Sequence, residues 1–410
     1  MADLSERLKA LGVRVGSGQI TTTGSKSSQK KELVNIIEGS WEETSRGDVF
    51  ILHRYYPVGK MFGNYPLVPA ENLSWFDNSE PGFSISPTPP DKIGYIDTET
   101  SGLSGGTGIY TFLIGVGRFE GDHFHLAQFF LQDPNSEPSQ LTALENFLAP
   151  LSTLVSYNGK SFDFPRLKTR YKLHGWPDPL ARFDHIDLLH LVRRIWKNYL
   201  PTCSLGEVEH RLLGVERSDS DIPGWQVSEV YLQYLSDRDP ESLKQVFYHN
   251  EIDIVSLAAL LSFISSRVNQ NLQKQIPNQE DLIHIARYIY FHLSRQKGKE
   301  LFELALESKN LSPDDKQEAN LLLASYYKGS NQIDQALTYW EKSAENGSLS
   351  AQIELAKAYE HHYSSYQEAI HWTLSALDHH QEKRLSTKQL SDLSARLKRL
   401  KGKVNSQMDK

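Results

Sequence analysis

The stretch Lys92-Ile93-Gly94-Tyr95-Ile96-Asp97-Thr98-Glu99-Thr100-Ser101-Gly102-Leu103 predicts the strand around which the fold is built. Its apolar first half indicates a buried strand, which Ser101 and Gly102 end. Successive side chains alternate between the two faces of a strand, so Asp97 and Glu99 project from the same face. Two carboxylates at this spacing repel each other unless a cation lies between them, and oxygen ligands suit magnesium or manganese. The alternative is an edge strand whose polar face meets solvent.

The composition is that of an ordinary soluble globular protein, with 410 residues, 39% hydrophobic residues and 23% charged residues. This length allows two or three domains. The net charge of -7 gives no general case for nucleic-acid binding, so such a role depends on local basic patches. The single cysteine, Cys203, excludes a disulfide framework and a cysteine zinc site. No signal peptide or bilayer-length apolar run is recognised, so we expect a cytoplasmic protein that does not enter a membrane.

Composition divides the chain into four expected parts. They are an N-terminal helix and flexible linker (1–31), an extension with a hairpin and a proline-rich boundary (32–91), an α/β domain (92–268), and helical repeats (275–403). In the extension, the run 49–56 follows a turn signal and is expected to be the second strand of the hairpin.

The α/β domain is predicted from the order of its strand-like and helix-like runs. Two strand-like runs, 111–119 and 123–131, flank the hairpin signal Glu120-Gly121-Asp122, so the first three strands are expected to be antiparallel. Helices and strands then alternate, with helices at 141–151, 162–173 and 188–197 and strands at 153–157 and 182–187. This order predicts a mixed sheet with a parallel half and flanking helices.

The last part of the chain is nearly all helical in pattern. Equivalent residues recur 32 positions apart from Tyr327 to Tyr359 and 33 apart from Ala336 to Ala369. Small alanines with aromatic residues between them resemble tetratricopeptide-like helical hairpins, which usually present a surface for a protein partner. A bundle that merely buttresses the α/β domain is weighted nearly equally. The basic tail 383–403 is expected to be a solvated helix first and a nucleic-acid contact second.

Two further segments carry acidic residues beside apolar elements. Asp163 falls near a helix N-terminus in the segment 157–165, where simple helix capping would also explain it. His249 and Asp253 lie one turn apart on a predicted helix and therefore share a face, although a surface hydrogen bond is the plain alternative. Asp187, near another strand end, is explained more simply as a helix cap than as support for a metal.

Together, the Asp-x-Glu strand and these two segments resemble the DEDD superfamily of 3′→5′ exonucleases, over residues 93 to about 263. Within it, the sequence is similar to the bacterial YprB-type ribonuclease-H-like proteins, some of which carry helical repeats after the nuclease domain. The supporting stretches are 103–108, 187–190, 203–209, 221–224 and 249–253. The resemblance implies a ribonuclease-H-like fold.

Carried over residue by residue, the resemblance implies that two divalent cations, Mg²⁺ or Mn²⁺, are bound by four carboxylates, those of Asp97, Glu99, Asp163 and Asp253. His249 would be the general base or orient the attacking water. Tyr248 remains an alternative, because one subclass of the family has a histidine five residues before the last aspartate and the other has a tyrosine four residues before it. In this sequence the two are exchanged: Tyr248 lies five residues and His249 four residues before Asp253. The two metals would activate water and stabilise the leaving 3′ oxygen.

The expected substrate is single-stranded DNA or RNA. Lys160 is the preferred phosphate contact, whereas Asn158 and Phe162 would shape a nucleotide pocket, with Phe162 expected in the core first and as a stacking residue second. A local basic excess surrounds them: Arg166, Lys168, Arg170, Arg193, Arg194 and Lys197. The leading hypothesis is a metal-dependent 3′→5′ exonuclease. The alternatives are a catalytically silent nucleic-acid-binding scaffold that recruits a partner through its repeats, and a structure-selective endonuclease.

Overall fold

The computed structural model describes residues 26–70, 73, 75, 88–102, 108–218, 221–269, 282–308, 311–378 and 385–408. The expected N-terminal helix, most of the expected linker and the stretch 103–107 lie outside this part. Helix α2 (Lys26–Ile37) begins within the last residues of the expected linker, which are therefore helical.

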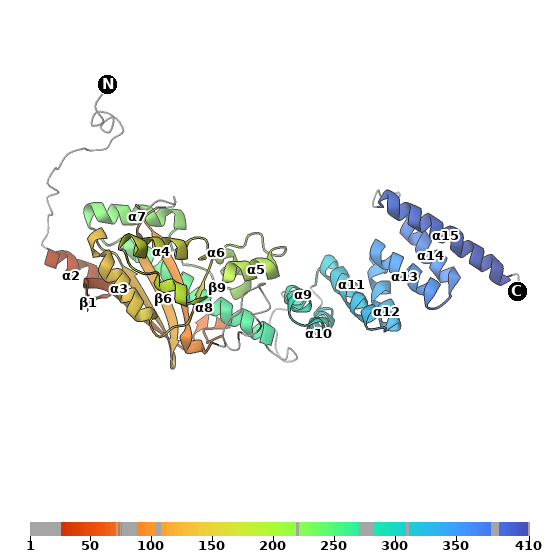
Figure 1. The fold of residues 1–410 in the computed structure, drawn as a ribbon, viewed down its shortest axis with the longest axis horizontal. Coiled ribbons are helices and arrows are strands. Elements are labelled where there is room, and N and C mark those ends of the chain that lie inside the picture. The colour runs from red at the N-terminus through yellow and green to blue at the C-terminus, as the bar shows by residue number, and fades with distance from the viewer. Residues whose placement is uncertain are drawn as a thin grey trace, which may run out of the picture.

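A seven-stranded sheet with the order β1-β2-β7-β6-β5-β8-β9 forms the centre of the N-terminal part (Figure 1). Its strands are β1 (Ser40–Thr44), β2 (Gly47–Pro57), β5 (Ile93–Thr100), β6 (Thr111–Glu120), β7 (His123–Phe130), β8 (Thr153–Ser156) and β9 (Asp184–Asp187). The first five strands in this order pair antiparallel, whereas β8 is parallel to β5 and β9 is parallel to β8. The predicted mixed sheet with a parallel half is confirmed. A separate two-stranded sheet contains β3 (Met61–Phe62) and β4 (Tyr65–Pro66).

The expected hairpin before residue 92 is present, but it is not a separate extension. Strand β2 pairs with β7 from Phe50 opposite Phe130 to Pro57 opposite His123, so β1 and β2 extend the central sheet. The run 49–52 of β2 is buried, and this apolar segment needs the sheet and its helices to cover it.

Helices cover both faces of the sheet. They are α3 (Glu137–Leu148), α4 (Asp163–Leu173), α5 (Leu188–Trp196), α7 (Gly224–Asp237) and α8 (Leu243–Asn269). Shorter turns of helix are η2 (Pro90–Lys92), η3 (Pro134–Ser136), η4 (Pro179–Arg182), α6 (Leu205–Val208) and η5 (Glu209–Leu213). The buried side of α3 and α4 packs with Ile96 and Ile114, whereas α5 and α8 pack with Tyr95 on the opposite face.

The C-terminal part is helical and extends away from the sheet (Figure 1). Its helices are α9 (Leu282–His292), α10 (Arg295–Ala305), α11 (Pro313–Gly329), α12 (Ile333–Glu345), α13 (Leu349–His361), α14 (Tyr366–Asp378) and α15 (Thr387–Met408). Consecutive helices pack against each other, and α9 also contacts α5 and α8, so one core is shared by both parts. The predicted helical character is confirmed, and the tetratricopeptide-like assignment stays a prediction.

The basic tail is helical, as expected, but several of its cations are engaged within the protein. Arg396, Arg399 and Lys403 of α15 donate to the carboxylate of Glu360, whose side chain is fully buried at the end of α13. These contacts attach the last helix to the preceding ones.

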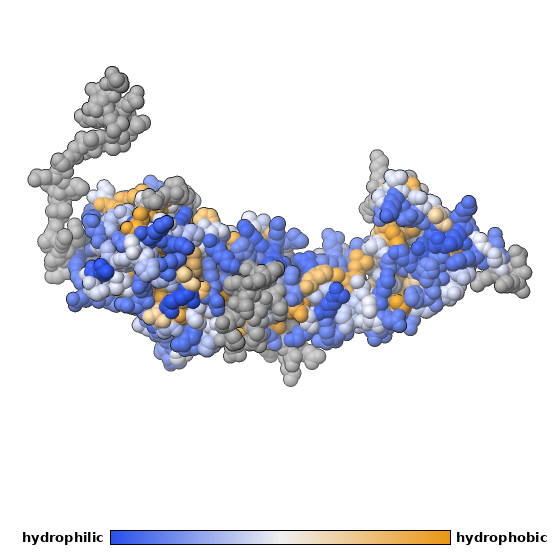
Figure 2. All heavy atoms as spheres, in the orientation of Figure 1, coloured by the Kyte–Doolittle hydropathy of each residue, from blue (hydrophilic) through white to orange (hydrophobic). Residues whose placement is uncertain are grey.

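Hydrophilic residues cover most of the face seen in Figure 2, on both parts of the molecule. Among the residues that the structure describes, no helix combines the length and apolar character needed to cross a membrane.

Candidate active site

The candidate site begins at the carboxyl end of β5, the central strand at which the antiparallel half of the sheet meets the parallel half. Asp97 and Glu99 occupy alternate positions of β5 and therefore share the face on which α8 packs. The side chain of Glu99 is only 14% exposed, so its carboxylate is largely shielded from water.

Asp163 reaches the site from the start of α4, directly after the loop that follows β8. Its Oδ1 accepts a hydrogen bond from the hydroxyl of Thr98, which fixes it beside β5. Gly159 permits this close approach, because a Cβ at that position would lie 2.3 Å from Ser156 Oγ and 3.1 Å from Asp163 Oδ2. Asp163 is therefore more than the capping residue that its position alone would explain.

Helix α8 contributes His249 and Asp253 from one face. The Nε2 atom of His249 lies 3.9 Å from Glu99 Oε1 and 3.8 Å from Asp253 Oδ2, and its Nδ1 lies 2.8 Å from Asp221 Oδ1. Asn250, on the next residue of the helix, donates from Nδ2 to Asp97 Oδ2 at 2.8 Å. The structure thus brings the three acidic segments together.

Arg217 lies at the centre of a network of ion pairs that includes Asp253. The guanidinium of Arg217 donates to Asp253 Oδ1 and makes a two-point contact with the fully buried Glu209, at 2.7 Å for each bond. It also donates to Asp221 at 3.2 Å, while the hydroxyl of Ser256 donates to Glu209 at 2.6 Å. Each charged group in this network therefore has an opposite charge or a hydrogen-bond partner.

The site is electrostatically unfavourable for four negative charges. Burial and repulsion from Asp253 and Asp163 raise the pKa of Asp97 well above its usual range. Burial and repulsion from Asp97, Asp253 and Asp163 likewise raise the pKa of Glu99 well above its usual range. Burial raises the pKa of Asp163 to about 6. Burial also raises the pKa of Asp253, although the charge of Arg217 opposes the increase. A nearby cation would relieve this repulsion.

The donor set fits a hard divalent cation, and in the structure the carboxylates accept hydrogen bonds from neighbouring side chains. Among the described residues, no three His, Cys, Asp or Glu side chains converge closely enough to chelate a metal. The carboxylates of Asp97, Asp163 and Asp253 accept hydrogen bonds from Asn250, Thr98 and Arg217 instead. Four oxygen-donor carboxylates are nevertheless the kind of ligand that Mg²⁺ or Mn²⁺ prefers.

The two candidate bases lie on different faces of α8. His249 points at the carboxylates, whereas Tyr248 lines a pocket with Arg54 and Glu251, beside α2 and β2. This separation follows from helix geometry, because only residues three or four apart share a face. The structure therefore places His249, and not Tyr248, beside Asp253.

The expected substrate residues lie along the loop between β8 and α4. Asn158 has a positive φ of 65°, and its N–H donates to Asp187 at 2.7 Å, while the N–H of Lys160 donates to the same carboxylate at 3.1 Å. Asp187 also caps α5 through the N–H of Leu189, as expected. Phe162 is 46% exposed, so the expectation that it belongs to the core is wrong. Phe164, two residues further on, is partly buried and packs against the core instead.

Part of the expected basic excess has a structural role. Arg170 makes a buried two-point contact with Glu137, at 2.5 and 2.7 Å, and Lys168 lies 3.4 Å from Asp178. Arg166 donates to the hydroxyl of Thr100 at 3.2 Å.

The charged and amide residues of the site that the sequence analysis did not single out are Glu209, Arg217, Asp221 and Asn250. All of them except Arg217 lie within stretches on which the family resemblance was based, and that is the signal that could have found them. Arg217 lies in a segment without regular structure between η5 and α7, so neither spacing nor periodicity indicates its partners.

Two comparisons with known proteins bear on this geometry. A family model described as the RNase H superfamily matches residues 94–265. The Bacillus subtilis (strain 168) protein named "Uncharacterized protein YprB" is 32% identical over 362 residues, which cover 86% of this chain and 85% of that protein. The chain belongs to the YprB family. The resemblance to YprB-type proteins is thereby confirmed, and the DEDD assignment stays a prediction.

In this YprB-family chain, the matched span 94–265 contains all four candidate carboxylates and His249. Proteins of the RNase H superfamily are usually nucleases, and such nucleases generally use divalent metal ions. Among solved structures, the family B DNA polymerase from the hyperthermophilic archaeon Pyrobaculum calidifontis aligns with a TM-score of 0.35 and 15% identity. The alignment covers 70% of this chain, which spans only 34% of that polymerase.

Proposed function

We propose that this protein is a metal-dependent 3′→5′ exonuclease that hydrolyses phosphodiester bonds of single-stranded DNA or RNA. The observation that carries the proposal is the meeting of Asp97, Glu99, Asp163, His249 and Asp253, from β5, α4 and α8, at one end of the sheet. Four buried acids, two of which (Asp97 and Glu99) have their pKa values raised further by the charges of the others, are costly to keep in a domain with no use for a cation. This cost favours a nuclease over a catalytically silent scaffold.

The four carboxylates would hold two divalent cations, which supply charge stabilisation at phosphorus and an activated water when they are bound. The chain itself provides the proton acceptor. Although burial opposes it, the hydrogen bond from His249 and the charge of Arg217 lower the pKa of Asp221. Asp221 therefore stays a carboxylate, and its Oδ1 lies 2.8 Å from His249 Nδ1, where it accepts the proton of the tautomer that carries hydrogen on Nδ1. Arg217 Nη1 lies 3.2 Å from the same nitrogen. In this tautomer the Nε2 atom, which faces Glu99 and Asp253, is free to accept a proton from water.

The direct test is digestion of 5′-labelled single-stranded DNA and RNA with Mg²⁺ or Mn²⁺. Wild-type protein is expected to produce a one-nucleotide ladder from the 3′ end, and Asp97→Asn is expected to produce none. Asp91→Asn is a suitable control, because this substitution also removes one negative charge. Asp91 lies just before β5, and its side chain is 59% exposed. Internal cuts would favour the endonuclease, and binding without cleavage under either metal would favour the scaffold.

A further inference from the structure

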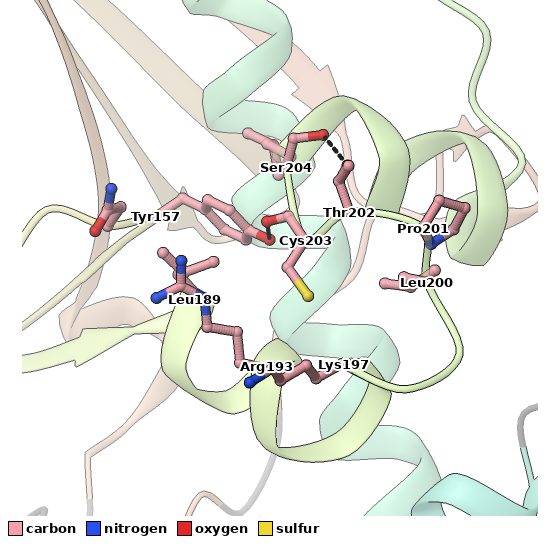
Figure 3. Close-up of a pocket in the computed structure, with 11 residues that line it drawn as sticks. Tyr157, Leu189, Arg193, Lys197, Leu200, Pro201, Thr202, Cys203 and Ser204 are labelled. Carbon is pink, nitrogen blue, oxygen red and sulfur yellow. Dashed lines mark hydrogen bonds between the residues drawn. The ribbon is translucent and has the colours of Figure 1, made fainter.

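A pocket of about 620 Å³ is lined in part by Tyr157 and Asn158, at the start of the loop that leads to Asp163 (Figure 3). Asn158 of this loop lines the pocket, five residues before Asp163 begins α4. The carboxylate of Asp187 accepts hydrogen bonds from the loop and from the first turn of α5, so one buried side chain fixes the pocket relative to the site. Pockets of this size accommodate small organic ligands.

The polar lining of the pocket is positively charged. Arg193 in the last turn of α5 and Lys197, the C-cap of that helix, lie four residues apart, and no Asp or Glu is among the residues that line the pocket. Both cations are exposed, and within the described part of the chain neither forms an ion pair with a carboxylate. The hydroxyls of Thr202 and Ser204, 3.1 Å apart, add hydrogen-bonding groups on the facing segment. Cations and hydroxyls in this arrangement suit a phosphate group.

The remaining lining is apolar and offers a surface for a base. The ring of Tyr157 is held by a hydrogen bond of 2.7 Å from its hydroxyl to the carbonyl oxygen of Cys203. Leu189, Leu200 and Pro201 complete this side of the pocket. A nucleotide combines an anionic phosphate with a flat base, so this pairing of cations with apolar surface matches its chemistry.

The charge of the pocket contrasts with that of the candidate active site. A phosphodiester strand is repelled by four carboxylates wherever they are not neutralised, so the strand needs cationic contacts next to them. Arg193 and Lys197 provide such contacts from the C-terminal end of α5, whose N-terminus is capped by the same Asp187 that orders the loop.

We propose that this pocket binds one nucleotide of the single-stranded substrate, other than the one that is cut, with its phosphate on Arg193 and Lys197. The base lies against Tyr157, Leu200 and Pro201. The proposal rests on the proposed function, because it takes the strand that the carboxylate site hydrolyses as its ligand. Arg193 and Lys197 then attract the strand when no metal is present.

The chain offers a built-in reporter of this pocket. Cys203 is the only cysteine among 410 residues and it lines the pocket, so modification of the protein by a thiol reagent reports on this position alone. Figure 3 shows its sulfur turned toward the side where Arg193 and Lys197 lie. The experiment measures the rate at which dithionitrobenzoate modifies the full-length protein in EDTA, with and without saturating oligothymidylate or oligouridylate.

We expect a bound oligonucleotide to slow this modification at least about tenfold, as a buried thiol is inert compared with an exposed one. Arg193→Gln with Lys197→Gln should abolish the protection and weaken oligonucleotide binding, with a shallower dependence on salt. The matched control is Lys168→Gln with Lys172→Gln, two exposed lysines at the same spacing on α4. Each variant is compared with itself, with and without oligonucleotide, so that changes in intrinsic thiol reactivity cancel.

An oligonucleotide that binds, as measured by fluorescence anisotropy, without protecting Cys203 would overturn the proposal. Equal loss of binding in the α4 control would also overturn it, because the effect would then be one of net charge. Since these measurements are made in EDTA, they are independent of hydrolysis. If Cys203 is protected but no metal supports hydrolysis, the nucleotide pocket is supported and the exonuclease proposal is refuted. If the nucleic acid is hydrolysed but Cys203 is not protected, the exonuclease is supported and the pocket is refuted.

Discussion

Arg217 holds Asp253, the last acid of the candidate site, through a hydrogen bond from Nη2 to Oδ1. The same guanidinium makes a two-point contact with the buried Glu209. Asp253 is thus linked, through one side chain, to a charge in the interior of the protein. The position of a proposed metal ligand therefore depends on an ion pair between two residues, Arg217 and Glu209, that are not themselves among the four candidate carboxylates.

Replacing Arg217 by Gln should destabilise the protein by about 3–5 kcal/mol, because the buried carboxylate of Glu209 loses its partner. Chemical unfolding followed by circular dichroism measures this free energy. The double variant Arg217→Gln with Glu209→Gln should recover part of it, since the unpaired charge of Glu209 is then removed as well. Arg211→Gln is the matched control, because Arg211 pairs with Glu207 at 3.0 Å with 53% of its own side chain exposed, and less than about 1 kcal/mol should be lost. Equal effects of both arginine variants would contradict the role of Glu209.

Divalent metal should stabilise the folded protein against heat. At a concentration about 100 times the Kd, a ligand that binds only the native state adds about 2.7 kcal/mol. Asp97→Asn should lose this gain and, in EDTA, should be more stable than wild type, since it removes one of four mutually repelling charges. Differential scanning fluorimetry with Mg²⁺, Mn²⁺ or EDTA makes the comparison. A wild-type melting temperature that does not respond to either metal would count against the carboxylate site.

Without metal, the protein should become more stable as the pH falls from 7 toward 5. Burial raises the pKa of Asp163 from 3.8 to about 6, so between these values the native state holds a proton that the unfolded state releases. The free energy of unfolding therefore rises on acidification, by up to about 1.4 kcal/mol per pH unit for this group. Unfolding in urea at several pH values, in EDTA, measures the slope. Asp163→Asn should flatten it, and an unchanged slope in that variant would refute the assignment.

His249→Asn should slow hydrolysis by about 10²–10⁴-fold, because the proton acceptor for water is lost. Tyr248→Phe should leave the rate unchanged, since this ring lies on another face of α8. Single-turnover cleavage of a labelled oligonucleotide separates the chemical step from product release. If the tyrosine variant were the slower of the two, the roles of these neighbouring residues would be reversed.

Much of the sheet was predictable because its signals are local. The turn Glu120-Gly121-Asp122 joins β6 to β7, and the alternation of helix and strand after residue 141 marks the parallel half. The pairing of β2 with β7 was not predictable, since more than 70 residues separate Phe50 from its partner Phe130. An apolar strand shows that it needs a neighbour but not which neighbour it takes.

The candidate site divides in the same way. The spacing of Asp97 and Glu99, and that of His249 and Asp253, follow from the period of a strand or a helix, and the structure keeps both arrangements. Phe162 was placed wrongly because its exposure depends on the backbone turn before α4, where its φ and ψ are -124° and -67°. Arg217 was missed because its partners come from η5 and α8, which only the tertiary fold brings together.

The contact of α9 with α5 and α8 sets a limit on how the chain can be divided. The side chains of Leu282, Ile285, Ala286 and Ile289 are buried in the same core as Trp196 and Phe263. A fragment cut after residue 268 would expose this apolar surface to water, and surfaces of this kind promote aggregation. The nuclease-like part and the first helices that follow it therefore form one folding unit, and a fragment meant to isolate the first should retain α9 and α10.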